Sequence, residues 1–171
     1  MYIFIYTVLT ALAVYCTVMM IVWDLRTRII PDAYLFPFML AGLILCDKLP
    51  WTGGFTESVI AAALGYFVGT AMNIVFLYIK ARKDVKCKNK RLRSETDTAW
   101  NDFDPIGMGD IKLLAAGGIW LGISGLAIAL IISSIAGAVW GMWRRQKFVP
   151  FAPFFFAGMA VAIITLVFLA F

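Results

Sequence analysis

Apolar and polar residues follow one another along the chain in long blocks, with six apolar runs separated by shorter polar segments. Most of the runs contain about twenty residues, the length that an α-helix needs to cross a hydrocarbon layer of about 30 Å. The second and fourth runs are shorter, and the second contains Pro37. The pattern predicts an all-α, polytopic integral membrane bundle that forms a single domain over residues 1–171. Its six predicted transmembrane segments are residues 2–23, 33–46, 58–79, 107–121, 126–143 and 150–171.

Glycine spacing within the runs indicates how the predicted helices pack and turn. Gly65 and Gly69 are four positions apart, a spacing that lets two membrane helices approach closely, and Gly137 and Gly141 repeat it. Residues 122–125, Gly-Ile-Ser-Gly, separate the fourth run from the fifth. The two glycine pairs therefore permit helix contacts within or between chains, and residues 122–125 predict a tight turn.

Charge gives the predicted bundle an orientation. The chain is 63% hydrophobic with a formal net charge of +5, and its basic residues lie between the apolar runs, so they are typical of topology determinants and not of a nucleic-acid surface. All of them except Lys48 and Lys112 fall on one side if the amino terminus is outside. The sequence thus predicts a multi-pass inner (plasma) membrane protein in contact with the lipid bilayer, with both termini non-cytoplasmic and a cytoplasmic loop at about residues 80–104.

The residue types that are missing restrict the possible chemistry. The sequence has no histidine, which excludes Ser-His-Asp triads, Cys-His dyads and HExxH zinc sites. Its three cysteines, Cys16, Cys46 and Cys87, lack the spacing of a zinc site or a disulfide framework. We therefore expect no metal and no cofactor, and any catalysis must use carboxylates, Lys, Tyr, Ser or Cys.

Two aspartates at the edges of apolar runs are the strongest candidates for function. Asp24 follows the first run, and Asp110 begins the fourth, so the predicted topology places both near the cytoplasmic interface. A charged side chain at membrane depth costs about 2.5–3.5 kcal/mol on insertion scales, which makes such a residue a functional candidate by default. Gly107 and Gly109 precede Asp110 and leave room for a peptide backbone to approach. Lys112 either balances charge in this site or extends to the interface.

Two neighbouring carboxylates cannot both ionise easily, so such a pair offers a general acid and a general base to one water molecule. That arrangement hydrolyses an amide without a metal or a covalent intermediate. Three alternatives remain at this point: Asp24 as a simple interfacial anchor, a small proton- or cation-coupled transporter that uses the aspartates as a relay, and a structural membrane subunit. The transporter is the main rival, although no repeat with paired broken helices is evident.

Three stretches of the sequence resemble the type IV prepilin peptidases, the bacterial branch of the GxGD aspartyl proteases. Residues 24–32 read Asp-Leu-Arg-Thr-Arg-Ile-Ile-Pro-Asp, residues 107–112 read Gly-Met-Gly-Asp-Ile-Lys, and residues 150–153 read Pro-Phe-Ala-Pro. The resemblance covers nearly the whole chain. It implies an aspartic endopeptidase that removes the leader of type IV prepilins or pseudopilins at the cytoplasmic face, with Asp24 and Asp110 catalytic.

The same resemblance indicates the residues that bind substrate or shape the site: Gly107, Gly109, Lys112, Pro31, Asp32, Pro150 and Pro153. Asp32 lies where the family commonly has Asn and would add a third acid, and Ala152 lies where it often has Gly. Longer members carry a cysteine-paired, zinc-binding region linked to N-methylation. This sequence contains no matching cysteine pairs, so methyltransferase activity is not expected.

Overall fold

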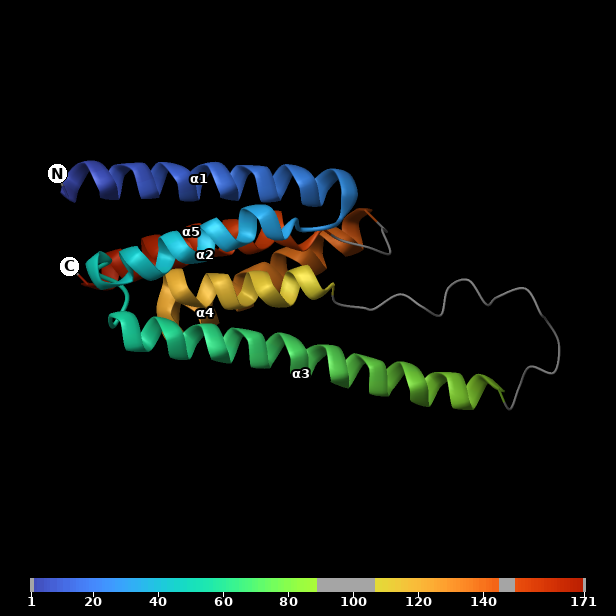
Figure 1. Cartoon of the computed structure of the whole chain (residues 1–171). Coiled ribbons are helices and arrows are strands. Elements are labelled where there is room, and N and C mark those ends of the chain that lie inside the picture. Colours follow the sequence, from blue (N-terminus) through green and yellow to red (C-terminus); the bar gives the residue numbers. More distant parts are fainter. Residues whose placement is uncertain (1, 89–106, 145–149, 171) are drawn as a thin grey trace.

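The computed structural model describes residues 2–88, 107–144 and 150–170, and these residues form a bundle of α-helices without a strand. The predicted all-α class is therefore confirmed. The helices run roughly along one common direction (Figure 1). In chain order the elements are α1 (Tyr2–Thr27), α2 (Asp32–Leu45), the short 3-10 helix η1 (Cys46–Lys48), α3 (Phe55–Lys88), α4 (Met108–Arg144) and α5 (Phe151–Ala170).

The prediction of six transmembrane segments is wrong in its count. Among the described residues four helices, α1, α3, α4 and α5, are long and apolar enough to cross a membrane. Helix α2 has 14 residues and spans about 21 Å at 1.5 Å per residue, which is less than the hydrocarbon layer. The predicted fourth and fifth segments are the two parts of α4 (37 residues), which Gly122 separates with a non-helical backbone, and together they count as one candidate span. The protein is thus a multi-pass helical membrane protein with four candidate spans.

The loop predicted at about residues 80–104 does not begin at residue 80. Helix α3 continues to Lys88, so residues 80–88 are helical, and residues 89–104 lie outside the described part of the chain. The run of basic residues that suggested a loop is compatible with a helix because lysine and arginine are good helix formers. Charge therefore marked the place where the apolar run ends but not the place where the helix ends.

Helix α4 reverses direction in its middle, as the predicted turn at residues 122–125 requires. Gly122 has φ 68° and ψ −172°, a backbone conformation that only glycine adopts without strain. The part of α4 before this residue and the part after it run back along each other (Figure 1). The second part begins at Ile123, whose backbone N–H donates to the Glu57 carboxylate at 3.4 Å. A carboxylate at a helix N-terminus stabilises the free N–H groups there.

Replacing Glu57 by Ala should lower the free energy of unfolding by about 1 kcal/mol, because the second part of α4 loses the acceptor at its N-terminus. Glu57→Gln keeps an acceptor oxygen and should lose less than half of that amount. Thermal unfolding of the purified protein in detergent measures both changes. Equal losses in the two variants would show that the carboxylate does not act as a cap.

Helices α3 and α4 pack tightly because glycines line their contact. A β-carbon built on Gly65 would lie 2.6 Å from the Leu114 carbonyl oxygen, and one built on Gly118 would lie 2.5 Å from the Ala61 carbonyl oxygen. Any side chain at these positions would push the two backbones apart. The close contact that the glycine spacing permits at Gly65 is therefore present, and it runs antiparallel, with α3 residue numbers rising as those of α4 fall.

A tryptophan holds the short helix α2 in place. The Trp120 indole N–H donates to the Phe38 carbonyl oxygen at 3.1 Å, and the two rings stack with centroids 5.2 Å apart. A β-carbon on Gly42 would lie 2.7 Å from the Trp120 indole nitrogen, so α2 approaches this ring directly. These contacts fix α2 against the first part of α4, which positions the start of α2 near the start of α4.

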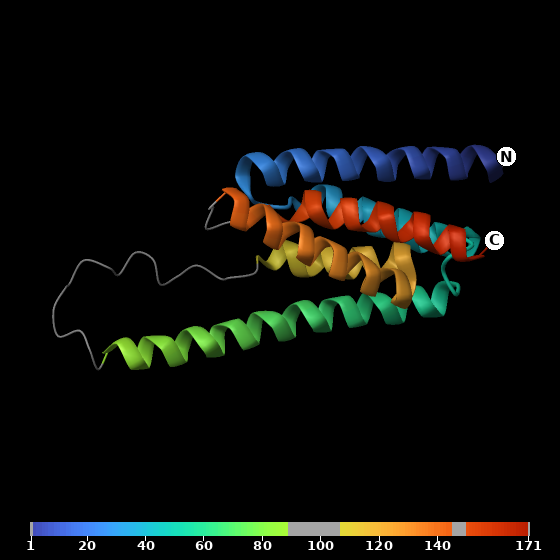
Figure 2. The ribbon, with the colours of Figure 1, turned by 180° about the vertical axis from the view of Figure 1, so that it is seen from behind.

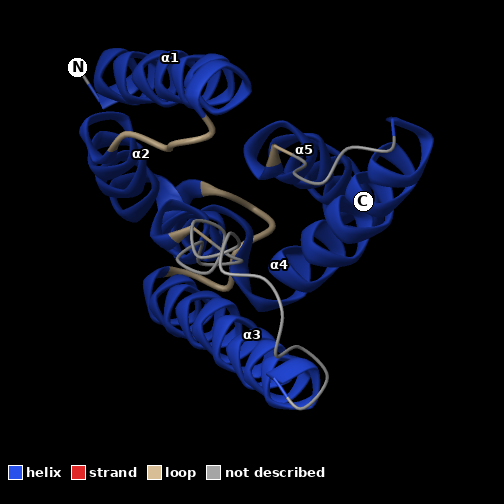
Figure 3. Ribbon diagram, turned by 90° about the vertical axis from the view of Figure 1, so that its right-hand side faces the viewer, coloured by secondary structure: helices blue, strands red, loops and turns tan. Residues whose placement is uncertain are grey.

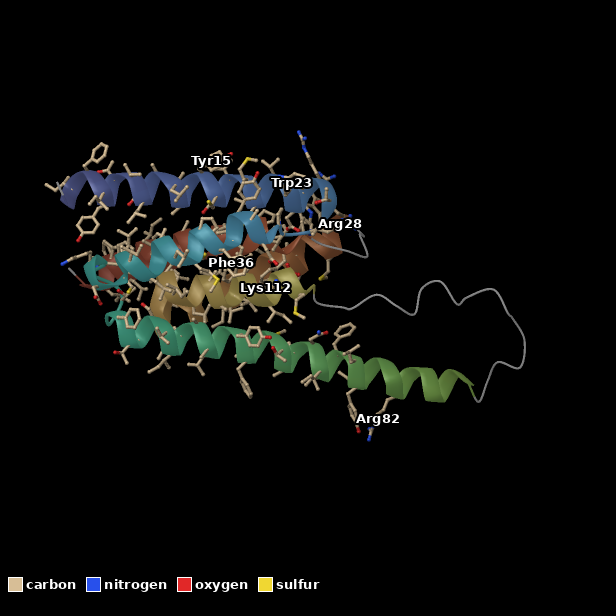
Figure 4. All side chains as sticks on the ribbon, in the orientation of Figure 1. Tyr15, Trp23, Arg28, Phe36, Arg82 and Lys112 are labelled. Atoms are coloured by element: carbon tan, nitrogen blue, oxygen red, sulfur yellow. The ribbon has the colours of Figure 1, made fainter. Side chains whose placement is uncertain are left out.

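Most of the candidate site residues belong to segments that meet at one end of the bundle. The end of α1, the start of α2, both ends of α4 and the start of α5 lie there, whereas both chain termini, η1 and the turn within α4 lie at the opposite end (Figures 1 and 2). Arg28, beyond the end of α1, and Arg82, far along α3, lie toward the first end (Figure 4). We call this first end the aspartate end, because Asp24 and Asp110 lie on it.

Candidate active site

Asp24 lies in the last turns of α1 and is 4% exposed. Its Oδ2 atom accepts a hydrogen bond from the Ala152 backbone N–H at 2.9 Å. Ala152 is in the first turn of α5, where backbone N–H groups have no partner within the helix. The N-terminus of α5 therefore holds one oxygen of the Asp24 carboxylate and favours its negative charge.

Asp110 lies in the first turn of α4 and is partly buried. The Gly107 carbonyl oxygen accepts hydrogen bonds from the Asp110 N–H at 3.0 Å and from the Ile111 N–H at 3.4 Å, which begins the helix. The Asp110 carboxylate in turn accepts a backbone hydrogen bond from Gly107. Each aspartate is thus bound at the N-terminus of a helix, Asp110 at its own and Asp24 at that of α5.

The structure brings the two aspartates together although they are far apart in sequence. Their carboxylates are near enough to interact as like charges, and Arg28 lies near enough to act on Asp24 with the opposite sign. Arg28, the residue after α1, has φ 56°, and its N–H donates to the Asp24 carbonyl oxygen at 3.0 Å. The arrangement is a carboxylate pair with a cation beside it.

A cavity of about 340 Å³ opens beside Asp110. Its other walls come from α3, the second part of α4 and the start of α5, and include Gly69, Met72, Gly137 and Pro150. A β-carbon on Gly137 would meet nothing within 4 Å, so this wall borders open space. Seen from the aspartate end, α3 and α1 lie on opposite sides of the first part of α4 (Figure 3). Asp110 therefore borders the cavity on the α3 side, and its carboxylate also interacts with that of Asp24.

The two glycines before Asp110 have different surroundings. A β-carbon on Gly109 would lie 3.1 Å from the Ile30 β-carbon, which is tighter than ordinary packing, whereas one on Gly107 would lie 3.7 Å from the Asp110 Oδ2 atom. The expected free space at Gly109 is thus filled by the protein's own α1–α2 connection. Of the two glycines, only Gly107 leaves the room near Asp110 that the sequence suggested for both.

Lys112 pairs with Asp32, an ion pair that sequence reasoning missed. The Lys112 Nζ atom lies 2.9 Å from Asp32 Oδ1 and 2.7 Å from Oδ2. Asp32 is the first residue of α2, after Pro31, whose carbonyl oxygen accepts the Tyr34 and Leu35 N–H groups and begins that helix. The third acid is therefore paired with a lysine, and the pair links the start of α2 to the first turns of α4.

The side chains of Lys112 and Asp32 are 34% and 50% exposed, so the ion pair should stabilise the fold by less than about 1 kcal/mol. We expect Lys112→Met and Asp32→Asn each to lower the free energy of unfolding within this limit. The double variant should lose no more than either single variant, because the second change removes a partner that is already unpaired. Thermal unfolding in detergent measures the cycle, and additive losses would mean that the two groups act independently.

Two prolines flank Ala152 at the start of α5: Pro150 directly precedes the helix, and Pro153 lies within it. Pro150 lines the cavity, and Pro153 lies in the first turn, where no N–H is needed. The donor to Asp24 is the backbone N–H of Ala152. Almost every residue type has this group, so the sequence cannot indicate which residue donates. The Pro-Phe-Ala-Pro pattern pointed to this segment but could not reveal the hydrogen bond.

Metal binding has no support in the described residues. Within residues 2–88, 107–144 and 150–170, no three His, Cys, Asp or Glu side chains are grouped in a way that could hold a metal ion. Cys16 and Cys46 are buried and unpaired, which suits small apolar side chains in a core.

Comparison with known proteins gives this site a family context. The model of the type IV leader peptidase family matches residues 10–142. A curated prepilin leader peptidase/N-methyltransferase of Burkholderia pseudomallei is 35% identical over 147 residues, covering 82% of this chain and 40% of the relative. The proteins of the same name from Xanthomonas campestris and Aeromonas salmonicida are 31% and 28% identical, each covering 77% of this chain and 40% of the relative. The chain thus spans about two fifths of their length. No solved structure matches it significantly.

Proposed function

The chain belongs to the type IV leader peptidase family, and from this premise we propose that it is an aspartic endopeptidase that removes the leader peptide of type IV prepilins or pseudopilins. Asp24 and Asp110 are the catalytic residues of this proposal. The observation that carries it is their geometry: two carboxylates from different helices interact at one end of the bundle, each bound by a backbone N–H at a helix N-terminus.

The proposed mechanism follows from the chemistry of such a pair. Two carboxylates in close range hold one proton between them, so one acts as a general base on a water molecule and the other as a general acid. The base activates the water for attack on the scissile carbonyl carbon. The acid polarises the carbonyl oxygen and then protonates the departing amine. The Ala152 N–H donates to Oδ2 of Asp24 and so orients this carboxylate in the site.

We also propose an orientation in the inner membrane. Arg26, Arg82 and Arg144 belong to segments that meet the aspartate end of the bundle. The positive-inside rule favours the cytoplasm for such an end. Asp24 and Asp110 would then work at the cytoplasmic face, with both termini on the opposite side.

The substrate in this proposal is a membrane-embedded prepilin. Its apolar segment would approach from the bilayer on the α3 side, where Gly137 leaves the cavity beside Asp110 open. The scissile bond would reach the carboxylates from that cavity. A β-carbon on Gly107 would lie 3.7 Å from the Asp110 Oδ2 atom, at ordinary contact distance, so the approach beside Gly107 is not tightly packed.

Leader release tests the proposal directly. The purified protein, reconstituted in detergent or bilayers, is incubated with a type IV prepilin, and mass spectrometry identifies both products. We expect cleavage at a single bond between the leader and the mature chain. Intact substrate after prolonged incubation with several prepilins and pseudopilins would reject the proposal and favour ion transport by the aspartates, which proton flux into liposomes would detect.

A further inference from the structure

Asn73 of α3 carries a polar atom that the fold does not use. Its side-chain oxygen Oδ1 is buried and has no hydrogen-bond partner among the described residues. The other such atom there is the Ser58 hydroxyl oxygen, near the opposite end of α3. A buried carbonyl oxygen without a donor costs about 1–3 kcal/mol, so an oxygen left in this condition requires an explanation.

The contact between α3 and α4 locates Asn73 next to the site. Gly65 packs on Leu114, and one turn later Gly69 packs on Leu114 and Ile111, with a β-carbon there lying 3.1–3.3 Å from their side chains. Asn73 follows Gly69 by four residues and so lies on the same face of α3. Because the helices are antiparallel, this register brings Asn73 to the level of Gly107, at the start of α4.

The cavity provides a second and independent link. Gly69 and Met72, on the same stretch of α3, line the cavity together with Asp110. Asn73 thus adjoins the wall of the space that a substrate must enter to reach the carboxylate. Its amide group offers one acceptor and two donors, which matches the N–H and C=O groups of an extended peptide.

On the basis of the proposed function, we propose that Asn73 binds the backbone of the substrate beside the scissile bond. A peptide must leave its helical form to be cut, and its backbone groups then lack partners in a lipid environment. The Asn73 oxygen accepts an N–H of the unwound segment, and its amide nitrogen donates to a neighbouring carbonyl. Such binding is independent of the substrate's side chains. It also explains why the oxygen is unpaired in the free protein.

Asn73→Leu tests this role, because Leu keeps the size of the side chain and removes its hydrogen-bonding groups. We expect kcat/KM for a synthetic prepilin peptide to fall about tenfold, as for the loss of one or two hydrogen bonds to the substrate. The melting temperature should stay equal or rise, since the buried oxygen that is removed has no hydrogen-bond partner among the described residues. Thr70→Val is the matched control. Its hydroxyl, also on α3, donates to the Tyr66 carbonyl oxygen at 2.8 Å, and the variant should cleave normally.

Substrates with one backbone amide replaced by an ester identify the contact itself. Esters are placed one at a time at the bonds flanking the cleavage site, so each peptide lacks a single N–H. For at least one position the wild-type protein should lose about tenfold in kcat/KM, and Asn73→Leu should lose almost nothing. Equal ester penalties in both proteins, normal cleavage by Asn73→Leu, or a lowered melting temperature of that variant would overturn the inference. Absence of cleavage by the wild-type protein would instead reject the proposed function on which the inference rests.

Discussion

Asp24→Asn and Asp110→Asn are each expected to lower the rate of leader release by at least about a thousandfold, because in the proposed mechanism either change removes one of the two groups that exchange a proton with water and substrate. Both variants should remain folded. An asparagine side chain keeps one oxygen that can accept a hydrogen bond, from the Ala152 N–H at position 24 and from Gly107 at position 110, so the hydrogen bonds to both helix N-termini can persist. Time courses of leader release by mass spectrometry, with melting temperatures in the same detergent, give both quantities.

Asp47→Asn is the matched control for these variants. Asp47 lies in η1, at the end of the bundle opposite the aspartate end, where its Oδ1 accepts the Phe55 N–H at 2.8 Å and so begins α3. Asn can accept the same hydrogen bond, and the variant should cleave at the wild-type rate. Cleavage within a factor of ten of wild type by either Asp24→Asn or Asp110→Asn would remove the substituted residue from the proposed mechanism.

Sequence patterns identified the two aspartates for physical reasons that hold generally. A carboxylate is costly near apolar runs, so Asp24 and Asp110 stood out against their surroundings. The distribution of basic residues then assigned both to one end of the molecule, and the helices of the structure meet at that end (Figure 2). Glycine also gave a local prediction that holds, because Gly122 adopts a positive φ where the chain turns.

Element boundaries were harder to predict, because hydropathy reports the surroundings of a residue and not its backbone hydrogen bonds. Helix α3 passes from apolar to basic residues without a break. The six apolar runs give four candidate spans, because α2 is too short and the fourth and fifth runs are joined in α4 across Gly122. The short helix α2 has an apolar sequence, but it owes its position to Trp120, 82 residues away from the carbonyl group that it binds. Such a contact cannot be predicted from a local pattern.

Contacts between distant residues are the part of the site that the sequence could not supply. Lys112 and Asp32 are 80 residues apart, and charge alone left several partners open for each. The donor to Asp24 lies 128 residues away and is a backbone group, so no residue type announces it. Nothing in the sequence was a reason to select Asn73, because it is one of several polar residues within a long apolar run. Its position next to the site follows only from the register of α3 against α4.

Ala152→Pro is expected to lower kcat for leader release by about a hundredfold, because proline has no N–H to donate to Asp24. A hydrogen bond to a charged group contributes about 1.5–3 kcal/mol, and a buried carboxylate that loses its donor bears the full cost. Helix α5 should survive the change, since Ala152 is in the first turn, where proline is tolerated and no N–H of the helix is lost. The effect should fall on kcat more than on KM, because Ala152 acts through Asp24 and not on the substrate.

Ala152→Val separates the loss of the N–H from the added volume. Ala152 is fully buried, and Val and Pro each add two carbon atoms at this position, so both crowd the same surroundings. Only Val retains the N–H and with it the hydrogen bond to the Asp24 carboxylate. Steady-state cleavage by the two variants should therefore differ by at least about tenfold in kcat, with Val the more active, as expected for the loss of one hydrogen bond to a charged group. Equal losses would attribute the effect to packing at the start of α5, and the N-terminus of that helix would then not be what holds Asp24 ready for the water.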